Sequence, residues 1–334
     1  MSNYKTMGNA SLKKIGVLTS GGDAPGMNAA IRAVVRTANY HKLECVGIRG
    51  GYTGLIEGNM IKMGARSVNN IINLGGTILR SARSTEFRTP EGRKKAYEQC
   101  IAHEIDALVC IGGDGTFTGA KIFAEEFGIK VIGVPGTIDN DIFGTDFTIG
   151  YDTALNTAME AIDKIRDTAT SHNRVFFIEV MGRDAGFIAL NSGIASGALD
   201  ILIPERKDSM NDMFETFEKA QKRGKTSSIV IVAEGEQLAT TYDLAKQTKE
   251  RFPDYDIRVS ILGHIQRGGA PSCADRVLAS RMGYGAVIGL MKGLTNVMAG
   301  IRSNDLVFTP IEDAIKKHNE INQDLLQISE ILAM

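Results

Sequence analysis

The sequence predicts an α/β protein of two doubly wound domains, whose mostly parallel sheets face each other across a cleft. Short apolar runs rich in Val and Ile alternate with longer segments of helical period. Near-continuous apolar strands separated by helices are typical of parallel sheets covered on both faces. The alternation restarts near residue 150 of 334, and this length suits two domains.

The elements of the first domain follow one another regularly. A strand is predicted over 14–19, and a helix over 24–40 follows a Gly-rich loop. The remaining expected strands lie at 44–49, 106–113 and 130–136, and the expected helices at 90–104 and 116–127.

The second domain opens with a long helix predicted over 152–171. A later helix over 274–291 and a strand over 296–302 are expected to return to the first domain. We therefore predict a larger domain of residues 13–149 plus about 265–312, and a smaller domain of residues 150–264 plus about 313–334. Strands of the smaller domain are expected at 174–182, 199–205, 227–235 and 256–263.

The composition argues against nucleic-acid and membrane partners. Hydrophobic residues make up 43% and charged residues 23%, and the net charge is −1, so no bulk charge attracts a polyanion. No run approaches the ~18 apolar residues that span a bilayer. Residues 1–14 are polar and do not resemble a signal peptide.

The four cysteines predict no disulfide and no zinc site. Cys45, Cys100, Cys110 and Cys273 are far apart, form no CxxC pair, and lie in or near apolar segments. We expect buried free thiols, which fit a reducing cytoplasm.

Three Gly-rich loops at predicted strand ends suggest a phosphate site. They are "TSGGDAPG" (19–26), "IGGDGT" (111–116) and "PGTIDND" (135–141). Gly21 and Gly22 precede a helix, whose first amides favour an anion, and Asp114 offers a hard oxygen for Mg²⁺. Each loop alone is also consistent with a turn without a ligand. The dinucleotide and Walker A patterns are absent, so the site is of another type.

The third loop places Asp139 and Asp141 two positions apart. Two ionised carboxylates repel each other, and burial makes it still less favourable to keep both of them charged. The simpler alternative is a polar turn after a strand, with Asn140 and the aspartates solvated or bonded to nearby backbone.

Basic residues gather at strand ends of the second domain. "LGHIQRGG" (262–269) carries His264 and Arg267, and Arg258 precedes them. Arg forks suit bidentate contacts to phosphate. The structural alternatives are a core histidine for His264 and a solvated strand start for Arg174. With Asp and Gly on one side and Arg, His and Glu on the other, the pattern suits phosphoryl transfer.

Five motifs in combination resemble the ATP-dependent 6-phosphofructokinases of bacterial type. They are "GVLTSGGDAPGMNAAIR", "IGGDGT", "PGTIDNDI", "VMGRDAG" and "LGHIQRGG", and the resemblance runs from about residue 13 to 310. It implies two Rossmann-like domains, one binding ATP and one binding fructose 6-phosphate, in a homotetramer with active sites at subunit interfaces. It also implies the glycolytic transfer of the ATP γ-phosphoryl group to the sugar 1-hydroxyl, with Mg²⁺.

The resemblance assigns roles residue by residue. Asp139 resembles the general base, Thr137 would lie near the transferring group, Asp141 would support the charge network and the metal, and Arg183 would stabilise the transition state. The nucleotide and Mg²⁺ positions are Gly22, Arg83, Ser84, Gly113, Asp114 (the metal ligand), Gly115 and Thr116. The sugar-phosphate positions are Thr137, Ile138, Asp139, Met181, Gly182, Arg183, Glu234, His264, Ile265, Gln266 and Arg267, with Arg174 and Arg258 from a neighbouring subunit.

Two glycines indicate ATP as the phosphoryl donor. Pyrophosphate-dependent relatives carry Asp at the position of Gly115 and Lys at that of Gly136. A larger side chain at Gly115 would fill space that the nucleotide needs.

The sequence departs from the family pattern near the nucleotide and in the regulatory site. Ser84 and Thr85 replace a usual Cys-Pro beside the nucleotide, and Ala65, with Arg66 beside it, stands near a usual arginine of the regulatory site. Arg80 stands where a Gly is usual, and we expect a solvated basic residue near the nucleotide. Leu199 stands where an acidic residue of the regulatory site is usual, and Asp200 should point to the opposite sheet face. We therefore expect weakened activation by ADP with anion binding retained. The matching positions of this ADP or phosphoenolpyruvate site are Arg32, Arg36, Arg66, Arg166, Arg223 and Lys225.

Three alternatives remain at this point. A pyrophosphate-dependent enzyme is disfavoured by Gly115 and Gly136. A catalytically inert nucleotide-sensing subunit would require a missing base, metal ligand or clamp. NAD and lipid kinases share "GGDGT" but lack the other motifs.

Overall fold

The computed structural model describes residues 12–172, 174–207, 209–225 and 228–333. Most of the polar segment 1–14, expected not to be a signal peptide, therefore lies outside the described residues. The chain forms two compact units. The first comprises the described residues up to Ile138, Ile142–Asp152 and Arg267–Asn319; the second comprises Asp139–Asp141, Thr153–Gln266 and the described residues from Glu320.

The first unit is built on a seven-stranded sheet in the order β11-β10-β5-β4-β1-β2-β3. Its five inner strands pair in parallel, and the edge strands β3 and β11 are antiparallel to their neighbours. The strand bounds are β1 (Lys14–Thr19), β2 (Glu44–Ile48), β3 (Met60–Lys62), β4 (Ala107–Gly112), β5 (Lys130–Pro135), β10 (Val297–Arg302) and β11 (Asp305–Pro310).

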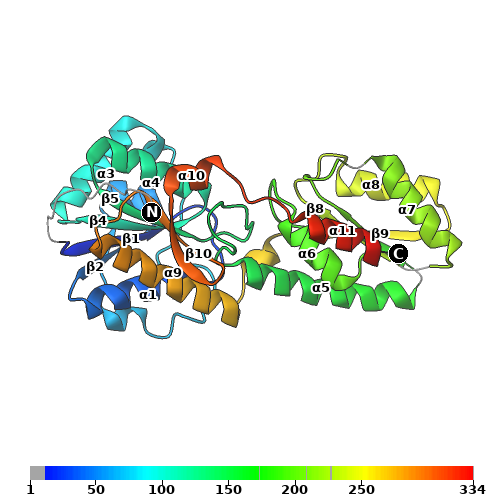
Figure 1. Ribbon diagram of the computed structural model, residues 1–334, viewed down its shortest axis with the longest axis horizontal. Helices are drawn as coiled ribbons and strands as arrows, with labels where there is room; N and C mark the ends of the chain where they lie inside the picture. The colour runs from blue at the N-terminus through cyan, green and yellow to red at the C-terminus, as the bar shows by residue number, and fades with distance from the viewer. Residues whose placement is uncertain (1–11, 173, 208, 226–227, 334) are drawn as a thin grey trace. The chain divides into compact units, whose positions relative to one another are not determined.

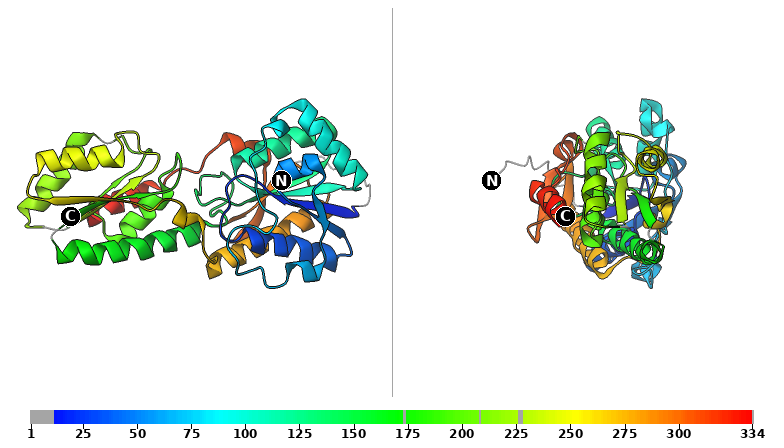
Figure 2. Two further views of the ribbon diagram at one scale, coloured as in Figure 1. Left: turned by 180° about the vertical axis from the view of Figure 1, so that it is seen from behind. Right: turned by 90° about the vertical axis from the view of Figure 1, so that its right-hand side faces the viewer.

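Helices cover both faces of this sheet (Figure 1). The reverse view in Figure 2 shows α1 and α9 side by side. Their close approach needs Gly283, because a Cβ there would lie 2.7 Å from the Ala30 carbonyl oxygen. The helix bounds are α1 (Met27–Tyr40), α2 (Gly51–Glu57), α3 (Pro90–Ala102), α4 (Asp114–Phe127), α9 (Cys273–Met291) and α10 (Ile311–Lys316), with 3₁₀ helices η1 (Ala65–Val68) and η2 (Glu86–Arg88).

The second unit is built on a four-stranded parallel sheet in the order β7-β8-β6-β9. The inner strand β8 is buried throughout, whereas the edge strand β9 is partly exposed. The strands are β6 (Arg174–Val180), β7 (Asp200–Leu202), β8 (Ser228–Ala233) and β9 (Asp256–Ile261). The helices are α5 (Tyr151–Ser171), α6 (Phe187–Ser196), α7 (Met210–Lys222), α8 (Thr241–Arg251) and α11 (Gln323–Leu332), with the 3₁₀ helix η3 (Gly263–Arg267).

The predicted α/β class with mostly parallel sheets is confirmed. The antiparallel edge strands β3 and β11 were not predicted from the sequence. Strand β3 has only three residues, and β11 is only partly buried, so neither shows the continuous apolar run of an inner strand. Within the described residues, the search for a helix long and apolar enough to span a membrane found none.

Three of the four cysteines are buried, as predicted. Burial raises the pKa of the Cys45, Cys100 and Cys110 thiols to about 12, which keeps them protonated and unreactive at neutral pH. The prediction is wrong for Cys273, which is exposed. Cys273 is the first residue of α9, directly after the capping Ser272, and the start of a surface helix faces solvent.

Candidate functional site

The three Gly-rich loops leave the same edge of the first sheet. Strand β4 pairs in parallel with both β1 and β5, with Thr19 opposite Ile111 and Gly112 opposite Pro135. The segments that follow these strand ends are therefore neighbours. Helix α1 begins directly after the first loop, and α4 begins at Asp114 within the second, so their unsatisfied amides point toward this edge.

The first two loops pack closely against each other at Gly112. A Cβ there would lie 2.3 Å from Thr116 Oγ1 and 2.4 Å from the Ser20 carbonyl oxygen. The Thr116 hydroxyl donates a hydrogen bond of 3.0 Å to the same Ser20 oxygen. Only glycine fits this position.

Gly115 and Gly136, the two glycines expected to select the phosphoryl donor, have different surroundings. A Cβ at Gly115 would meet no atom within 4 Å, and the residue is exposed. A Cβ at Gly136 would lie 3.2 Å from Ile111 and from Met27. A side chain at Gly115 would therefore occupy open space above the loop, whereas one at Gly136 would press on the core.

Arg80 adopts a backbone φ of 59°, in the left-handed region that favours glycine. This conformation is a physical reason for the glycine usual at this position. The Thr19 hydroxyl donates a 2.9 Å hydrogen bond to the Arg80 carbonyl, and the Ser81 hydroxyl donates to the Gly21 carbonyl. Arg80 and Arg83 are both exposed, and Ser84 accepts a hydrogen bond from the Phe87 amide.

The third loop is largely buried, so the solvated form of the polar-turn alternative is wrong. Thr137, Asp139 and Asn140 are buried, and Asp139 is only 7% exposed. Thr148 Oγ1 donates a 2.7 Å hydrogen bond to the Thr137 carbonyl, which holds the loop against its own return segment. Asn140 adopts a φ of 58°, which asparagine tolerates better than most residues.

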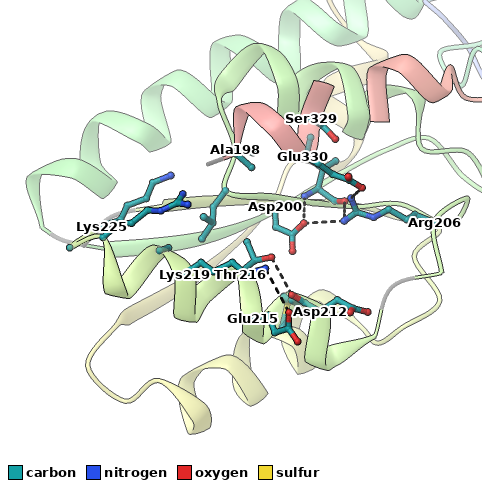
Figure 3. Close-up of a pocket in the computed structure, with 17 residues that line it drawn as sticks. Ala198, Asp200, Arg206, Asp212, Glu215, Thr216, Lys219, Lys225, Ser329 and Glu330 are labelled. Carbon is teal, nitrogen blue, oxygen red and sulfur yellow. Dashed lines mark hydrogen bonds and ion pairs between the residues drawn. The ribbon is translucent and has the colours of Figure 1, made fainter. Parts of the chain in front are cut away.

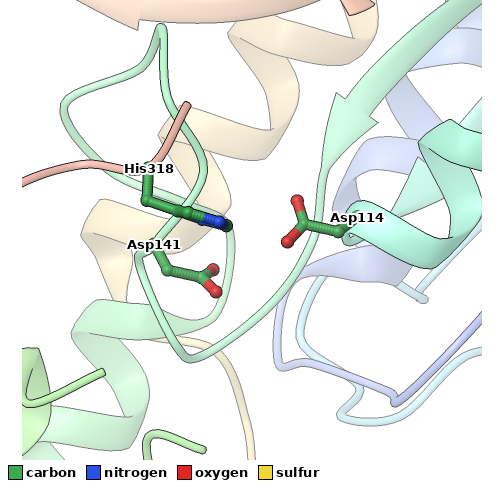
Figure 4. A group of neighbouring side chains, drawn as sticks. All are labelled: Asp114, Asp141 and His318. Carbon is green, nitrogen blue, oxygen red and sulfur yellow. The ribbon is translucent and has the colours of Figure 1, made fainter. Parts of the chain in front are cut away.

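Asp114, Asp141 and His318 form a cluster that suits a divalent cation. One ligand atom of each lies within 4.8 Å of those of the other two, and Figure 4 shows Asp114 facing the other pair. The isolated bridge between Ile142 and His318 brings the imidazole there. Two carboxylates fit Mg²⁺, and an imidazole is a ligand of softer divalent metals. The sequence reading missed His318, which lies far along the chain outside the five motifs.

In the second unit, Asp256 connects two of the predicted clamp residues. Asp256 on β9 is directly opposite Arg174 on β6. Its carboxylate accepts from Arg174 Nε at 2.8 Å and lies 2.7 Å from Arg258 Nη1. The hydrogen bond from Arg174, together with the charge of Arg258, lowers the pKa of Asp256. Arg174 is therefore not a simply solvated strand start, and sequence reasoning missed Asp256.

The ends of β6 and β8 bring two predicted segments together. A Cβ at Gly235 would lie 2.0 Å from the Arg183 carbonyl oxygen, so Glu234 and Arg183 belong to touching loops. Arg183 has a φ of 55° and an exposed side chain. A strained non-glycine backbone is frequent at functional sites.

The residues of the "HIQR" segment (264–267) lie in three different environments. Gln266 is fully buried and accepts a 3.3 Å hydrogen bond from the Met181 amide, which fixes Gly182 beside it. His264 and Ile265 are exposed. Arg267 belongs to the first unit, where its guanidinium lies against Gly22.

A cavity of about 820 Å³ lies at the β7 edge of the second sheet, lined by residues of α7 and α11 (Figure 3). Arg206 lies 3.1 Å from Asp200 and 3.9 Å from Glu330, so one end of the cavity is neutralised. The expectation that Asp200 faces away from Leu199 is wrong, since both line this cavity. Leu199 precedes β7, and the alternation of a pleated strand does not extend to it.

The opposite end of the cavity is basic. Figure 3 shows Lys225 far from Arg206, and Arg223 also lines the cavity. The pKa of Lys225 is lowered, mainly because the protein partly desolvates its ammonium group and also because Arg166 and Arg223 repel it. The residue as a whole is nevertheless exposed. The other three predicted effector residues, Arg32, Arg36 and Arg66, belong to the first unit.

Glycine loops at one sheet edge, a carboxylate-rich cation cluster and paired arginines define a class of phosphoryl-transfer proteins. The family profile named Phosphofructokinase matches residues 14–290. The chain belongs to the phosphofructokinase family.

Curated relatives match along almost the whole chain. An ATP-dependent 6-phosphofructokinase of Cytophaga hutchinsonii is 57% identical, over 96% of this chain and 98% of the relative. An ATP-dependent 6-phosphofructokinase 1 of Thermus thermophilus is 55% identical, over 97% of this chain and 100% of the relative.

Solved structures have the same fold. A phosphofructokinase from Saccharomyces cerevisiae aligns with a TM-score of 0.87 and 38% identity, over 91% of this chain and 45% of the yeast chain. A pyrophosphate-dependent phosphofructokinase from Marinobacter aquaeolei aligns with a TM-score of 0.82 but 22% identity, which supports the fold alone.

Proposed function

We propose that this chain is an ATP-dependent 6-phosphofructokinase, which transfers the γ-phosphoryl group of ATP to the 1-hydroxyl of fructose 6-phosphate. The observation that carries the proposal is the burial of Asp139, on the segment that follows β5, a strand whose neighbours in the sheet are followed by the other two glycine loops. The relatives of more than half identity bear the same activity in their names.

Asp139 is the general base in this proposal. A carboxylate within hydrogen-bond reach of the sugar hydroxyl accepts its proton as the oxygen attacks the γ-phosphorus. The bond between the γ-phosphorus and the β,γ-bridging oxygen breaks, so fructose 1,6-bisphosphate and ADP are the products. Thr137 and Ile138, on the same loop, position the transferring group and the sugar. Arg183 stabilises the negative charge of the transition state.

The nucleotide positions are grouped in the first unit and the sugar-phosphate clamp mostly in the second. Gly22, Gly113, Gly115 and Thr116 lie on the loops that receive the nucleotide phosphates, with Arg83 and Ser84 toward the nucleoside. Glu234 and the backbone at Met181 and Gly182 contact the sugar ring. His264, Ile265, Gln266 and Arg267 form the 6-phosphate side, together with Arg174 and Arg258 of a neighbouring subunit.

Asp114 and Asp141 would hold the Mg²⁺ ion, with His318 beside them. The bound cation would neutralise phosphoryl oxygens. The residues themselves align the donor and exclude water, which is most of the catalytic work in phosphoryl transfer.

The donor is tested by comparing ATP with pyrophosphate in a coupled assay with fructose 6-phosphate and Mg²⁺. We expect activity with ATP alone, and at least about a 10³-fold loss of kcat in Asp139→Ala. The exposed Asp254→Asn variant is the control and should keep wild-type kcat. Activity with pyrophosphate would contradict the role of Gly115. Tight ATP binding without turnover would favour an inert sensor.

The basic end of the cavity at the β7 edge forms part of an effector site for anions. Arg166, Arg223 and Lys225 repel one another, and a phosphate or carboxylate ligand such as ADP or phosphoenolpyruvate would relieve this. Leu199 offers no charge, and Asp200 is engaged by Arg206. ADP activation should therefore be weak although anions bind.

A thermal-shift titration with inorganic phosphate tests this site. Lys225→Met should raise the melting temperature without phosphate, since it removes a repelled charge, and should reduce the phosphate-induced shift. The shift should also shrink as pH rises toward the lowered pKa of Lys225, because only the protonated form attracts the anion. Lys219→Met is the control, since Lys219 lines the same cavity but lies 3.7 Å from Glu215. Strong, saturable ADP activation would refute the weakened-activator hypothesis.

A further inference from the structure

Resting on the proposed function, we propose that Arg267 also binds the phosphoryl donor, through its contact with the glycine loop at Gly22. The resemblance gives this residue only to the sugar 6-phosphate. The structure places its side chain against the loop assigned to the nucleotide.

The guanidinium of Arg267 lies close to Gly22, with Nη1 nearest. A Cβ added at Gly22 would lie 2.9 Å from Nη1, 3.4 Å from Cζ and 3.8 Å from Nη2. Nη1 also donates to the Asp23 carbonyl at 3.4 Å, a long hydrogen bond. Glycine at position 22 is therefore what allows the positive group to rest on the loop.

The chain around Arg267 is held against the same loops. A Cβ at Gly75 would lie 2.3 Å from the Gly269 carbonyl oxygen, so this segment and the 75–76 loop are in backbone contact. A Cβ at Gly76 would in turn lie 3.8 Å from an Asp23 carboxylate oxygen. All these residues belong to the first unit, so the contact does not depend on the second.

The guanidinium of Arg267 adds positive charge at a place where an anion is expected to bind. Gly22 precedes α1, whose first amides already favour negative charge. Arg267 is partly buried, and partial burial strengthens its attraction for a phosphate. Its guanidinium thus serves the nucleotide phosphates while the sugar phosphate is absent.

The test is calorimetric binding of AMP-PNP with Mg²⁺, without sugar phosphate. Arg267→Met should raise the Kd about tenfold, and Arg267→Lys should restore part of the loss because the charge returns. His264→Asn is the matched comparison from the same segment. It should leave the AMP-PNP Kd unchanged while it weakens binding of fructose 6-phosphate.

A double-mutant cycle tests the contact itself. Gly22→Ala places a methyl group 2.9 Å from Nη1 and should displace the guanidinium, so its cost should largely vanish in the Arg267→Met background. Full additivity, or an unchanged Kd in Arg267→Met, would overturn the inference. Failure of the wild-type protein to bind AMP-PNP would instead count against the proposed function. Melting temperatures of all variants identify any that fail to fold.

Discussion

At the scale of single residues, Asp256 holds the two arginines that are proposed to clamp the sugar phosphate. Strand pairing sets Asp256 opposite Arg174, and its carboxylate also reaches Arg258. Two guanidinium groups that would otherwise repel are held side by side by one carboxylate. A phosphate that meets them finds a prearranged pair, so less side-chain entropy is lost on binding.

Asp256→Ala should weaken sugar-phosphate binding. We expect the KM for fructose 6-phosphate to rise about tenfold with kcat nearly unchanged, because in the proposed function the arginines contact the 6-phosphate and not the reacting hydroxyl. Steady-state kinetics at saturating ATP measures both constants. Asp243→Ala, at an exposed helix start in the same unit, should have no such effect. An unchanged KM in Asp256→Ala would refute the positioning role.

At the scale of secondary-structure elements, Arg93 ties α3 to α4. Its guanidinium binds Glu126 through two hydrogen bonds of 2.6 Å, and donates to the carbonyls of Phe87 and Arg88. The arginine side chain is 8% exposed and the glutamate 34%. A shielded, bidentate pair of this kind is harder to break than a surface pair.

Arg93→Met should lower the free energy of unfolding by about 2 kcal/mol, less than a fully buried pair because Glu126 is partly solvated. The hydrogen bond from Arg93 lowers the pKa of Glu126 from its ordinary 4.5. The pair's stabilisation is therefore present above pH 4.5 and is lost as pH falls through the lowered pKa.

Urea titrations at neutral and acid pH measure this difference. The exposed pair of Lys164 and Glu160, four residues apart on α5, is the control. Lys164→Met should change stability much less than Arg93→Met, because solvent screens the exposed pair. Equal effects of the two substitutions would show that burial adds nothing at Arg93.

At the scale of the whole molecule, the proposed homotetramer makes the active site a shared one. Arg258 lies on the edge strand β9 with a side chain that is 52% exposed, and Ile261 and Ile265 nearby are exposed apolar residues. An exposed edge with apolar side chains suits contact with another copy of the chain.

Subunit complementation tests the shared site. Asp139→Ala and Arg258→Met should each be nearly inactive at low fructose 6-phosphate. Co-expression in equal amounts should restore about a quarter of the wild-type activity, since half of the two-fold pairs are mixed and each has one intact site. No recovery in co-purified hybrids would place Arg258 in the site of its own chain.

The sequence determined the class of the fold and the loops that carry the chemistry. Apolar runs such as 107–112 are local patterns, and a parallel sheet brings their carboxyl ends to one edge whatever else the chain does. The motifs around Asp114 and Asp139 can therefore be recognised in the sequence alone.

Only the tertiary structure decided the partners of those residues. Asp256 between two arginines, His318 beside Asp114 and Arg267 on Gly22 all join residues that are far apart in sequence or outside any motif. The exposure of Cys273 likewise depends on which side of α9 meets the sheet. The repeat of apolar residues along a segment determines whether it forms a helix or a strand and which of its faces is buried. A contact between two side chains depends instead on the packing of the whole unit, which a local pattern does not encode.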